Sequence, residues 1–467
     1  MSGGRVHRSL GERLCGGLVF ASWVAREHRG YHEYRKEFER TQFLSCEALQ
    51  SLQQERLQRL VRHAAERCPF YRERFAAAGI DTNGAWSREA WQRLPLLTKR
   101  DIQDHGEAMQ AREFPENARV RNQTGGSTGS PLQFYVDRRR LASRMASTHR
   151  HNAWTGLQPG DWLAQLWGAR LDQLPAGGAW NWMRRHLLYR TLDLNTSSIG
   201  EGDWETYIAL LRRYRPRFLV SYARSAVELA EYLQEHKITD IGFQSIITTA
   251  EVLMPAQRAL IEQVLGGKVF NRYGCREVSV IASECSEHSG MHVNAEALLV
   301  EIVPSPELPA PWGKVVVTDL LNESMPLIRY EIGDVARWAE NTCACGRGLP
   351  MLAEVEGRTT DFLHLPDGRA VSGPALTLVI ADLSNVRQVQ FVQREREEVI
   401  LRVVPGRGYD AGARQELQRR LDLYLKGAAR LTIEEVDAIP TEVSGKYRFV
   451  KSELDPAGRG KAAGGEA

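Results

Sequence analysis

The N-terminal part of the chain carries apolar residues at mixed spacings of three and four, between many Arg, Glu and Gln residues. This is the period of amphipathic α-helices, whose apolar stripe faces a core. One such stripe runs from Leu49 to Val61. The pattern predicts that residues 1–92 form helices that pack as a cap on the main domain.

Between residues 115 and 350 the pattern changes to short runs rich in β-branched and aromatic residues. Helix-like stretches, such as Ala226–Glu235 and Ala256–Leu265, separate several of these runs. Strands that alternate with helices predict a layered α/β domain. The later runs lie closer together, which favours a smaller β-rich subdomain near residues 290–350. The expected strands are Leu132–Val136, Phe218–Tyr222, Ser245–Thr249, Lys268–Tyr273, Leu298–Val303 and Val315–Asp319.

A third pattern follows Arg358 and predicts a compact α+β domain of about a hundred residues. It combines strand-like runs with an amphipathic helix at Ala411–Lys426. The runs are Gln388–Val392, Val399–Val404 and Leu431–Val436. Residues 455–467 are rich in Gly and Ala, and we expect them to form a disordered tail.

Length and charge narrow the class of protein. With 467 residues, the chain exceeds the roughly 250–300 residues of a single core, so at least two domains are expected. The net charge is only +3, from 61 basic and 58 acidic residues. This balance excludes nucleic acid as the main partner, because phosphate binding needs a concentrated basic face.

The longest early apolar run, Leu14–Ala25, is shorter than the about 20 residues that cross a bilayer. No convincing small-residue cleavage site follows it, so we expect neither a transmembrane segment nor a signal peptide. Weak contact of this run with a membrane surface stays an alternative. Seven sparsely spaced cysteines fit a reducing cytoplasm better than a disulfide framework.

A glycine-rich turn, Arg121–Pro131, is the most informative stretch for chemistry. Its glycines allow positive φ and bring N–H groups close to an anion, and its Ser and Thr add hydroxyl donors, so it can wrap a triphosphate. No Lys-Ser or Lys-Thr follows the last glycine, which excludes a Walker loop, and the dinucleotide fingerprint is absent too. A flexible linker is the alternative. The strand-like Leu132–Val136 directly afterwards weakens it.

This turn resembles the phosphate-binding signature of the adenylate-forming superfamily, which includes acyl-CoA synthetases. Cys68–Phe75 and Leu94–Ile102 resemble N-terminal signatures of the phenylacetate–coenzyme A ligase family, and the chain is similar to its CapK-like branch, often found with capsular-polysaccharide genes. The resemblance implies a large, multi-layer adenylation domain and a small, mobile α+β C-terminal domain. It assigns phosphate binding to Thr124, Gly125, Gly126, Ser127, Thr128 and Gly129.

The segment Phe270–Glu277 ends a predicted strand with an aromatic and an acidic residue. A carboxylate at a strand end can hold Mg²⁺, which bridges phosphate oxygens, and the Tyr273 ring can flank a purine. A solvated glutamate in a plain strand–turn is the alternative. The resemblance makes Glu277 the magnesium ligand. The superfamily usually has Thr before this glutamate, so Arg276 puts the usual hydroxyl contact in doubt, although it can give charge to the α-phosphate. By the same resemblance Glu251 belongs to an adenine-pocket segment.

The run Ile328–Asp334 resembles the family's Arg-Tyr-x-x-Gly-Asp motif. An ionised Asp334 can accept hydrogen bonds from both ribose hydroxyls, whereas a commonplace Gly-Asp turn is the alternative. The resemblance also places Arg358 near the nucleotide and makes Asp361 the pivot of a hinge. We therefore expect a large domain with its helical part at 1–92 and its ATP- and acid-binding core at 93–357, a hinge at 358–361 and a small domain at 362–454.

Lys446 lies in a Ser-Gly-Lys turn near the end of the small domain. Adenylation builds negative charge as a carboxylate attacks the α-phosphate and pyrophosphate departs, and a cation at that charge favours the transition state. The resemblance gives this catalytic role to Lys446, and a solvated lysine is the alternative.

Four residues in two separate segments suggest a zinc site. Three thiolates and one imidazole suit tetrahedral Zn²⁺, and four protein ligands leave no open position for catalysis. The expected ligands of this structural zinc are Cys285, His292, Cys343 and Cys345, with His288 as the alternative histidine. Buried cysteines without metal are the other alternative.

Together these features predict a cytoplasmic enzyme that uses ATP and Mg²⁺ to convert a small-molecule carboxylic acid to an acyl-adenylate and then passes the acyl group to coenzyme A. Transfer to an amine, a hydroxyl or a carrier protein is the second hypothesis, and an inactive nucleotide-binding scaffold is the third. The aromatic residues Trp154, Trp162 and Trp167 favour an aryl or other hydrophobic acid, unless they belong to the core. A homodimer stays an open alternative.

Overall fold

The structure is a computed structural model of the whole chain. It describes residues 11, 14–124, 132–168, 178–196, 201–306, 308, 310–358, 362–372, 376, 379, 386–406, 408–439 and 449–454. Among them, no helix is long and apolar enough to cross a membrane.

Within the described residues, the helices predicted for residues 1–92 are confirmed, and one further helix follows at Lys99–His105. Ser45 caps one of them by accepting a hydrogen bond from the N–H of Ala48, and Thr98 and Asp101 form a capping box on another. Their apolar faces share a single hydrophobic core with the later strands of the large domain, so this part is a cap on that domain. The helices are α2 (Phe20–Glu27), α3 (Tyr31–Thr41), α4 (Cys46–Arg67), α5 (Pro69–Ala78), α6 (Arg88–Arg93) and α7 (Lys99–His105), preceded by the π-helical turn η1 (Cys15–Val19).

An eleven-stranded mixed sheet organises the described part of the large domain. Its strands are β3 (Leu163–Trp167), β4 (Thr191–Asn195), β5 (Phe218–Tyr222), β6 (Ser245–Thr249), β7 (Lys268–Cys275), β8 (Ser279–Glu284), β9 (Met291–Val293), β10 (Leu298–Pro304), β11 (Gly313–Asp319), β12 (Tyr330–Trp338) and β13 (Met351–Arg358). The spatial order is β10-β11-β12-β13-β9-β8-β7-β6-β5-β3-β4. The β4 to β7 half is parallel, and the remainder is antiparallel.

The β-rich structure expected near residues 290–350 is present as strands β9 to β12, but these strands do not form a sheet of their own. The short strand β9 pairs with β8 on one side and with β13 on the other, so β10 to β13 continue the same hydrogen-bonded sheet. The close spacing of these strands reflects antiparallel connections, which need few residues, whereas the parallel half needs a helix at each crossover.

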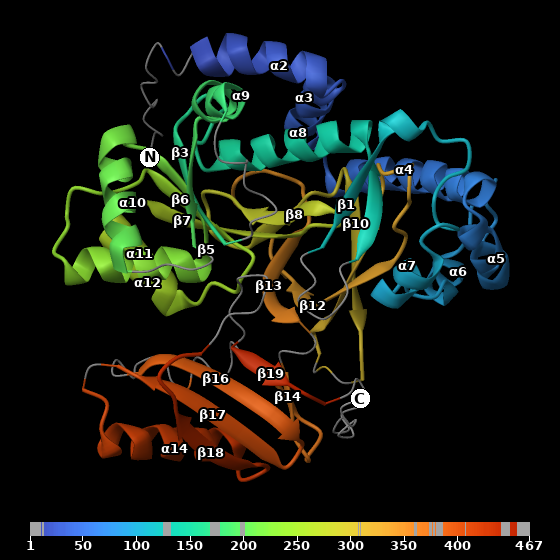
Figure 1. The fold of residues 1–467 in the computed structure, drawn as a ribbon. Coiled ribbons are helices and arrows are strands. Elements are labelled where there is room, and N and C mark those ends of the chain that lie inside the picture. Colours follow the sequence, from blue (N-terminus) through green and yellow to red (C-terminus); the bar gives the residue numbers. More distant parts are fainter. Residues whose placement is uncertain are drawn as a thin grey trace.

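Helices cover the sheet, as Figure 1 shows. These helices are α8 (Arg138–Trp154), α10 (Glu201–Tyr214), α11 (Ala223–Glu235) and α12 (Pro255–Leu265). The helix α8 packs against α3 and β8. The helices α10, α11 and α12 enclose a second hydrophobic core with the parallel strands. A short helix, α9 (Ala179–Met183), continues into the π-helical η4 (Arg184–Tyr189) near α2.

The C-terminal domain is an α+β unit below the large domain in Figure 1, with its own core. Its strand pattern is confirmed, with the sheet order β18-β17-β16-β19 and a separate pair, β14 and β15. The elements are β14 (Phe362–His364), β15 (Ala370–Ser372), β16 (Val386–Glu395), β17 (Glu398–Pro405), α14 (Ala411–Leu425), β18 (Arg430–Glu435) and β19 (Val450–Ser452).

Candidate functional site

A hairpin of β1 (Arg119–Gln123) and β2 (Gln133–Asp137) carries the glycine-rich turn. Thr124 closes its neck, since its N–H donates to the Leu132 carbonyl at 2.9 Å and its hydroxyl accepts from the Leu132 N–H at 3.0 Å. Several predicted site residues lie outside the described residues. They are Gly125, Gly126, Ser127, Thr128, Gly129, Asp361 and Lys446.

Two tyrosine–carboxylate pairs bring distant predicted residues together. The Tyr273 hydroxyl, on β7, donates to Asp334 on β12 at 2.7 Å. The Tyr330 hydroxyl, at the start of β12, donates to Glu277 in the β7–β8 turn at 3.0 Å. The residues predicted to bind ribose and magnesium therefore share a single cluster with the predicted purine-flanking tyrosine. Arg358 ends β13 in register with Asp334.

Burial tunes this cluster so that its tyrosines act as neutral donors. It raises the pKa of Tyr273 well above its ordinary value, and the nearby Asp334 carboxylate adds to the rise. The pKa of Tyr330 is raised in the same way, by burial first and by Glu277 second. Both phenols therefore keep their protons at neutral pH, and the two carboxylates accept from them.

Two buried arginines on α8 donate hydrogen bonds to the main chain of the turn that carries Glu277. The Arg140 guanidinium pairs with Asp319 at 2.7 Å and donates to the Val278 carbonyl at 3.1 Å. Arg144 donates to the carbonyl oxygens of Arg276 and Glu277, and it lies 3.6 Å from Asp319. Burial lowers the pKa of Arg144 to about 10, with help from the Arg140 charge, so it remains a cation at neutral pH.

Sequence reasoning missed this support and also gave Tyr330 no role. Tyr330 belongs to the Arg-Tyr-x-x-Gly-Asp run, so its position in that motif was an available signal. Arg140 and Arg144 gave no such signal, because a helix with many arginines predicts a solvated face. Cys275, next to the cluster, is partly buried, and its pKa is raised by burial and by Glu277, so its thiol is a poor nucleophile.

Glu251 has a local partner. Its carboxylate accepts a hydrogen bond from the N–H of Arg224 at 2.8 Å, at the start of α11. Arg224 also reaches the small domain. With the Gln388 amide oxygen turned towards it, that oxygen accepts from both terminal nitrogens of the guanidinium.

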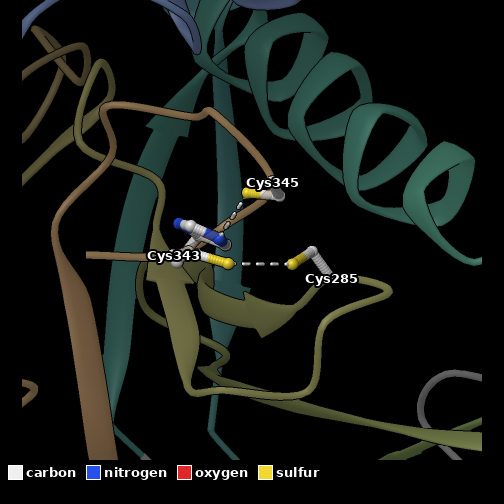
Figure 2. A group of neighbouring side chains, drawn as sticks. Cys285, Cys343 and Cys345 are labelled. Atoms are coloured by element: carbon white, nitrogen blue, oxygen red, sulfur yellow. Dashed lines mark hydrogen bonds between the residues drawn. The ribbon is translucent and has the colours of Figure 1, made fainter. Parts of the chain in front are cut away.

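The structure brings the predicted zinc ligands together (Figure 2). The ligand atoms of Cys285, His292, Cys343 and Cys345 all lie within 4.8 Å of one another. The Cys285 and Cys343 sulfurs are 3.6 Å apart, and the Cys345 sulfur is 3.3 Å from His292 Nε2. His288 is not in this group, because its Nδ1 pairs with Glu284 at 3.2 Å.

The surroundings of this Cys/His cluster suit a metal. His292 Nδ1 lies 3.4 Å from the Leu349 carbonyl, which can fix the ring and leave Nε2 for a metal. Burial lowers the pKa of His292 to about 4, so the imidazole is neutral, as a ligand must be. Burial opposes ionisation of Cys345, yet hydrogen bonds from the N–H and guanidinium of Arg347 and from Cys343 and Cys285 together lower the pKa of this thiol.

The three tryptophans expected near the acid do not form one group. Trp154 stacks on His151 at 4.3 Å between centroids and contacts His292 edge-on at 5.7 Å, so it packs against the Cys/His cluster. Trp162 lies 4.9 Å from the Tyr214 ring. Trp167 contacts Tyr222 at 4.5 Å, where β3 and β5 end side by side.

Comparisons with known proteins agree with this architecture. A phenylacetate-coenzyme A ligase of Thermus thermophilus is 32% identical over 332 residues, which is 68% of this chain and 72% of the relative. Protein CapK of Staphylococcus aureus is 23% identical over 438 residues, 91% of this chain and 94% of the relative. The family model described as the CapK C-terminal domain matches residues 363–453.

A solved structure supports the fold. The crystal structure of 2-hydroxyisobutyryl-CoA ligase in the postadenylation state superposes with a TM-score of 0.71 at 22% identity, covering 87% of this chain and 90% of that one. With the large domain, the small domain and the ligase relatives in agreement, this chain belongs to the phenylacetate-coenzyme A ligase family and to its CapK-like branch.

Proposed function

We propose that this protein activates a carboxylic acid with ATP to form an acyl-adenylate, and then transfers the acyl group to coenzyme A. The observation that carries the proposal is the convergence of Tyr273, Glu277, Tyr330 and Asp334 from two distant strands. Such a cluster offers a carboxylate for ribose, a second carboxylate for a cation and an aromatic face for a base.

In the first half-reaction, a substrate carboxylate oxygen attacks the α-phosphorus of ATP, and the bond to the pyrophosphate oxygen breaks. Asp334 accepts hydrogen bonds from the ribose hydroxyls, and Tyr273 fixes the orientation of that carboxylate. Bound Mg²⁺ would neutralise phosphate charge beside Glu277. We assign binding of the phosphates to the turn at 124–129, with Arg276 at the α-phosphate and Lys446 as the cation at the developing charge.

In the second half-reaction, a thiol sulfur attacks the acyl carbon, the bond to AMP breaks, and the thiol proton leaves to solvent. We assign the change between half-reactions to rotation of the small domain about Asp361, with Arg358 at the nucleotide side of the hinge. Zn²⁺ held by Cys285, His292, Cys343 and Cys345 would serve a structural role, since all four positions belong to the protein.

Acid-dependent exchange of labelled pyrophosphate into ATP, across a panel of acids, tests the first half-reaction. Glu277→Gln should lower the exchange rate at least about 100-fold, because it removes a charge from the cation site. The exposed Glu287, on the loop after β8, gives a matched control, since Glu287→Gln should leave exchange unchanged. Unaltered exchange in Glu277→Gln would contradict the assignment.

Lys446→Ala should depress adenylate formation while leaving thiolysis of supplied acyl-adenylate largely intact. Lys451 lies in the same domain and pairs with Glu453 at 3.0 Å, so Lys451→Ala controls for loss of a lysine. Equal loss of both half-reactions in Lys446→Ala would argue against this division of labour.

A second candidate function differs in the acceptor, which would be an amine, a hydroxyl or a carrier protein. The small domain favours considering it, because this domain matches the CapK C-terminal domain, and the CapK match covers far more of the chain than the ligase match does. Mass spectrometry of the products with and without coenzyme A separates the candidates, since a thioester forms only under the first. Nucleotide binding without exchange for any acid would instead indicate an inactive scaffold.

A further inference from the structure

The exposed apolar side chains of this protein are concentrated in two neighbouring segments. Six of the nine large apolar side chains that are exposed in the described residues lie in η1 with its preceding residue and in α9–η4. They are Leu14, Leu18, Val19, Trp180, Trp182 and Leu187. Three are more than half exposed: Leu18 at 65%, Trp180 at 57% and Trp182 at 59%.

The two segments lie against each other although about 160 residues separate them in sequence. The Trp23 ring of α2 contacts the Tyr189 ring of η4 at 5.3 Å, and Arg190 reaches the Cys15 sulfur at 3.6 Å. Figure 1 shows α2 and α9 side by side at the edge of the large domain that lies away from the small domain. We call the exposed apolar residues of these two segments the tryptophan face.

The segments that form the tryptophan face carry more basic than acidic residues. Residues 14–29 and 178–193 contain five arginines and two acids, Glu27 and Asp193, for a net charge of +3. Two of these arginines, Arg26 and Arg29, are exposed. The Arg184 guanidinium lies over the Tyr189 ring at 5.6 Å, and Arg185 is 3.5 Å from Asp193. The whole chain also has a net charge of +3, so the rest of the chain is neutral overall.

We propose that the tryptophan face docks the protein onto an anionic lipid bilayer surface. Tryptophan prefers the boundary between headgroups and acyl chains, and arginines beside it are attracted to anionic headgroups. A second copy of the chain is a poorer occupant, because a symmetric dimer through this face would bring the same positive charges together. The inference concerns where the enzyme works and does not depend on the reaction proposed above.

Cosedimentation with unilamellar vesicles tests this proposal. Wild-type protein should bind vesicles of phosphatidylglycerol and phosphatidylcholine, bind pure phosphatidylcholine vesicles at least about tenfold more weakly, and lose binding at high salt. The triple variant Leu18→Ser, Trp180→Ser, Trp182→Ser should lose at least about tenfold in binding, because apolar area drives insertion. Arg26→Glu with Arg29→Glu should weaken binding to anionic vesicles only.

A matched pair of leucines controls for non-specific hydrophobic binding to vesicles. Leu423, on α14 of the small domain, is 71% exposed and resembles Leu18 in exposure. Leu18→Ser should lower vesicle binding about threefold, whereas Leu423→Ser should leave it unchanged. Thermal unfolding should show every variant folded at the assay temperature, because the replaced apolar side chains are more than half exposed, although Trp182 also stacks on His186 at 4.7 Å between ring centroids.

Three results would overturn the inference. These are absence of wild-type binding to anionic vesicles, equal binding to neutral ones, and undiminished binding of the triple variant. Self-association that the triple variant abolishes, without vesicle binding, would identify the face as an interface between copies and would also refute lipid docking.

Discussion

Replacing Arg144 by methionine should damage both stability and catalysis, by similar free energies. Arg144 donates to two main-chain carbonyls of the turn that carries Glu277, and it shares Asp319 with Arg140. Methionine fills a similar volume but leaves both carbonyls without this donor. Asp319 keeps Arg140 at 2.7 Å, so the substitution does not leave a buried charge unpaired.

The structure sets the expected magnitudes. Hydrogen bonds from a charged donor contribute about 1.5–3 kcal/mol each, and one of the two here is long at 3.4 Å, so the loss of stability should be about 3 kcal/mol. A substitution that left a buried charge without its ion-pair partner would lower the free energy of unfolding by more, about 3–5 kcal/mol. A displacement of Glu277 by about 1 Å lowers the rate about 100-fold, which corresponds to about 2.7 kcal/mol of transition-state stabilisation.

Two assays separate positioning from folding. Urea unfolding gives the stability change, and pyrophosphate exchange at a temperature where the variant is fully folded gives the rate. If Arg144 positions Glu277, the Mg²⁺ concentration for half-maximal exchange should also rise about tenfold, as expected when a ligand is misplaced. Arg139 is exposed on the same helix, so Arg139→Met should change none of these quantities.

The reasoning would be refuted by an Arg144→Met enzyme whose folded fraction has the wild-type rate and Mg²⁺ requirement. Arg144 would then contribute packing and charge to the core without any effect on the turn. Arg144→Lys adds a graded test. A lysine keeps the charge but cannot hold two carbonyls in a planar fork, so its rate should fall between those of the wild type and Arg144→Met.

Three further predictions follow from other parts of the structure. Burial lowers the pKa of His149 to about 3 in the folded protein, whereas the unfolded chain has a histidine pKa near 6.5. The folded protein therefore holds this imidazole neutral. The resulting contribution to the free energy of unfolding is lost as the pH falls below about 6.5. In urea unfolding, wild type should lose about 1.4 kcal/mol more than His149→Phe between about pH 7.5 and about pH 5.5; equal losses would contradict this. Metal analysis should find about one zinc per wild-type chain and far less in Cys345→Ser, with a lower melting temperature; a metal-free wild type would exclude the zinc site. Tyr273→Phe should raise the KM for ATP about fivefold, because Asp334 loses the hydrogen bond that helps to orient its carboxylate; an unchanged KM would disprove this.

The sequence was most informative where burial alone decides the structure. The strands Phe218–Tyr222 and Ser245–Thr249 were predicted with the bounds that the structure has, because both are buried runs between clear helices. The pairing of strands was harder to predict from the sequence. The three residues of β9 join β8 to β13, and local spacing does not encode this long-range pairing, so the continuity of the sheet could not be predicted.

The site residues also differ in how well the sequence predicts them: residues in short motifs could be predicted, and residues that act through long-range contacts could not. The turn at Glu277 and the aspartate at 334 could be found because short motifs carry them, and their convergence followed from the resemblance. Arg144 and Asp319 lie outside any motif, and their roles depend on a contact between α8 and the end of β11. Trp154 shows the converse problem, since a large aromatic residue has the same sequence signal in a pocket wall as in the packing around a Cys/His cluster.

The placement of contacts also bears on how one site can serve two reactions. The Tyr273–Asp334 and Tyr330–Glu277 pairs lie wholly within the large domain, so a rotation of the small domain leaves them unchanged. The contact of Arg224 with Gln388 joins the two domains and must break in such a rotation. In the proposed reaction the large-domain residues that bind the nucleotide therefore keep their positions in both half-reactions. The small-domain residues that face the acyl phosphate differ between the two half-reactions. This separation is what a two-step ligase requires, because the adenylate must stay bound while its chemical surroundings change.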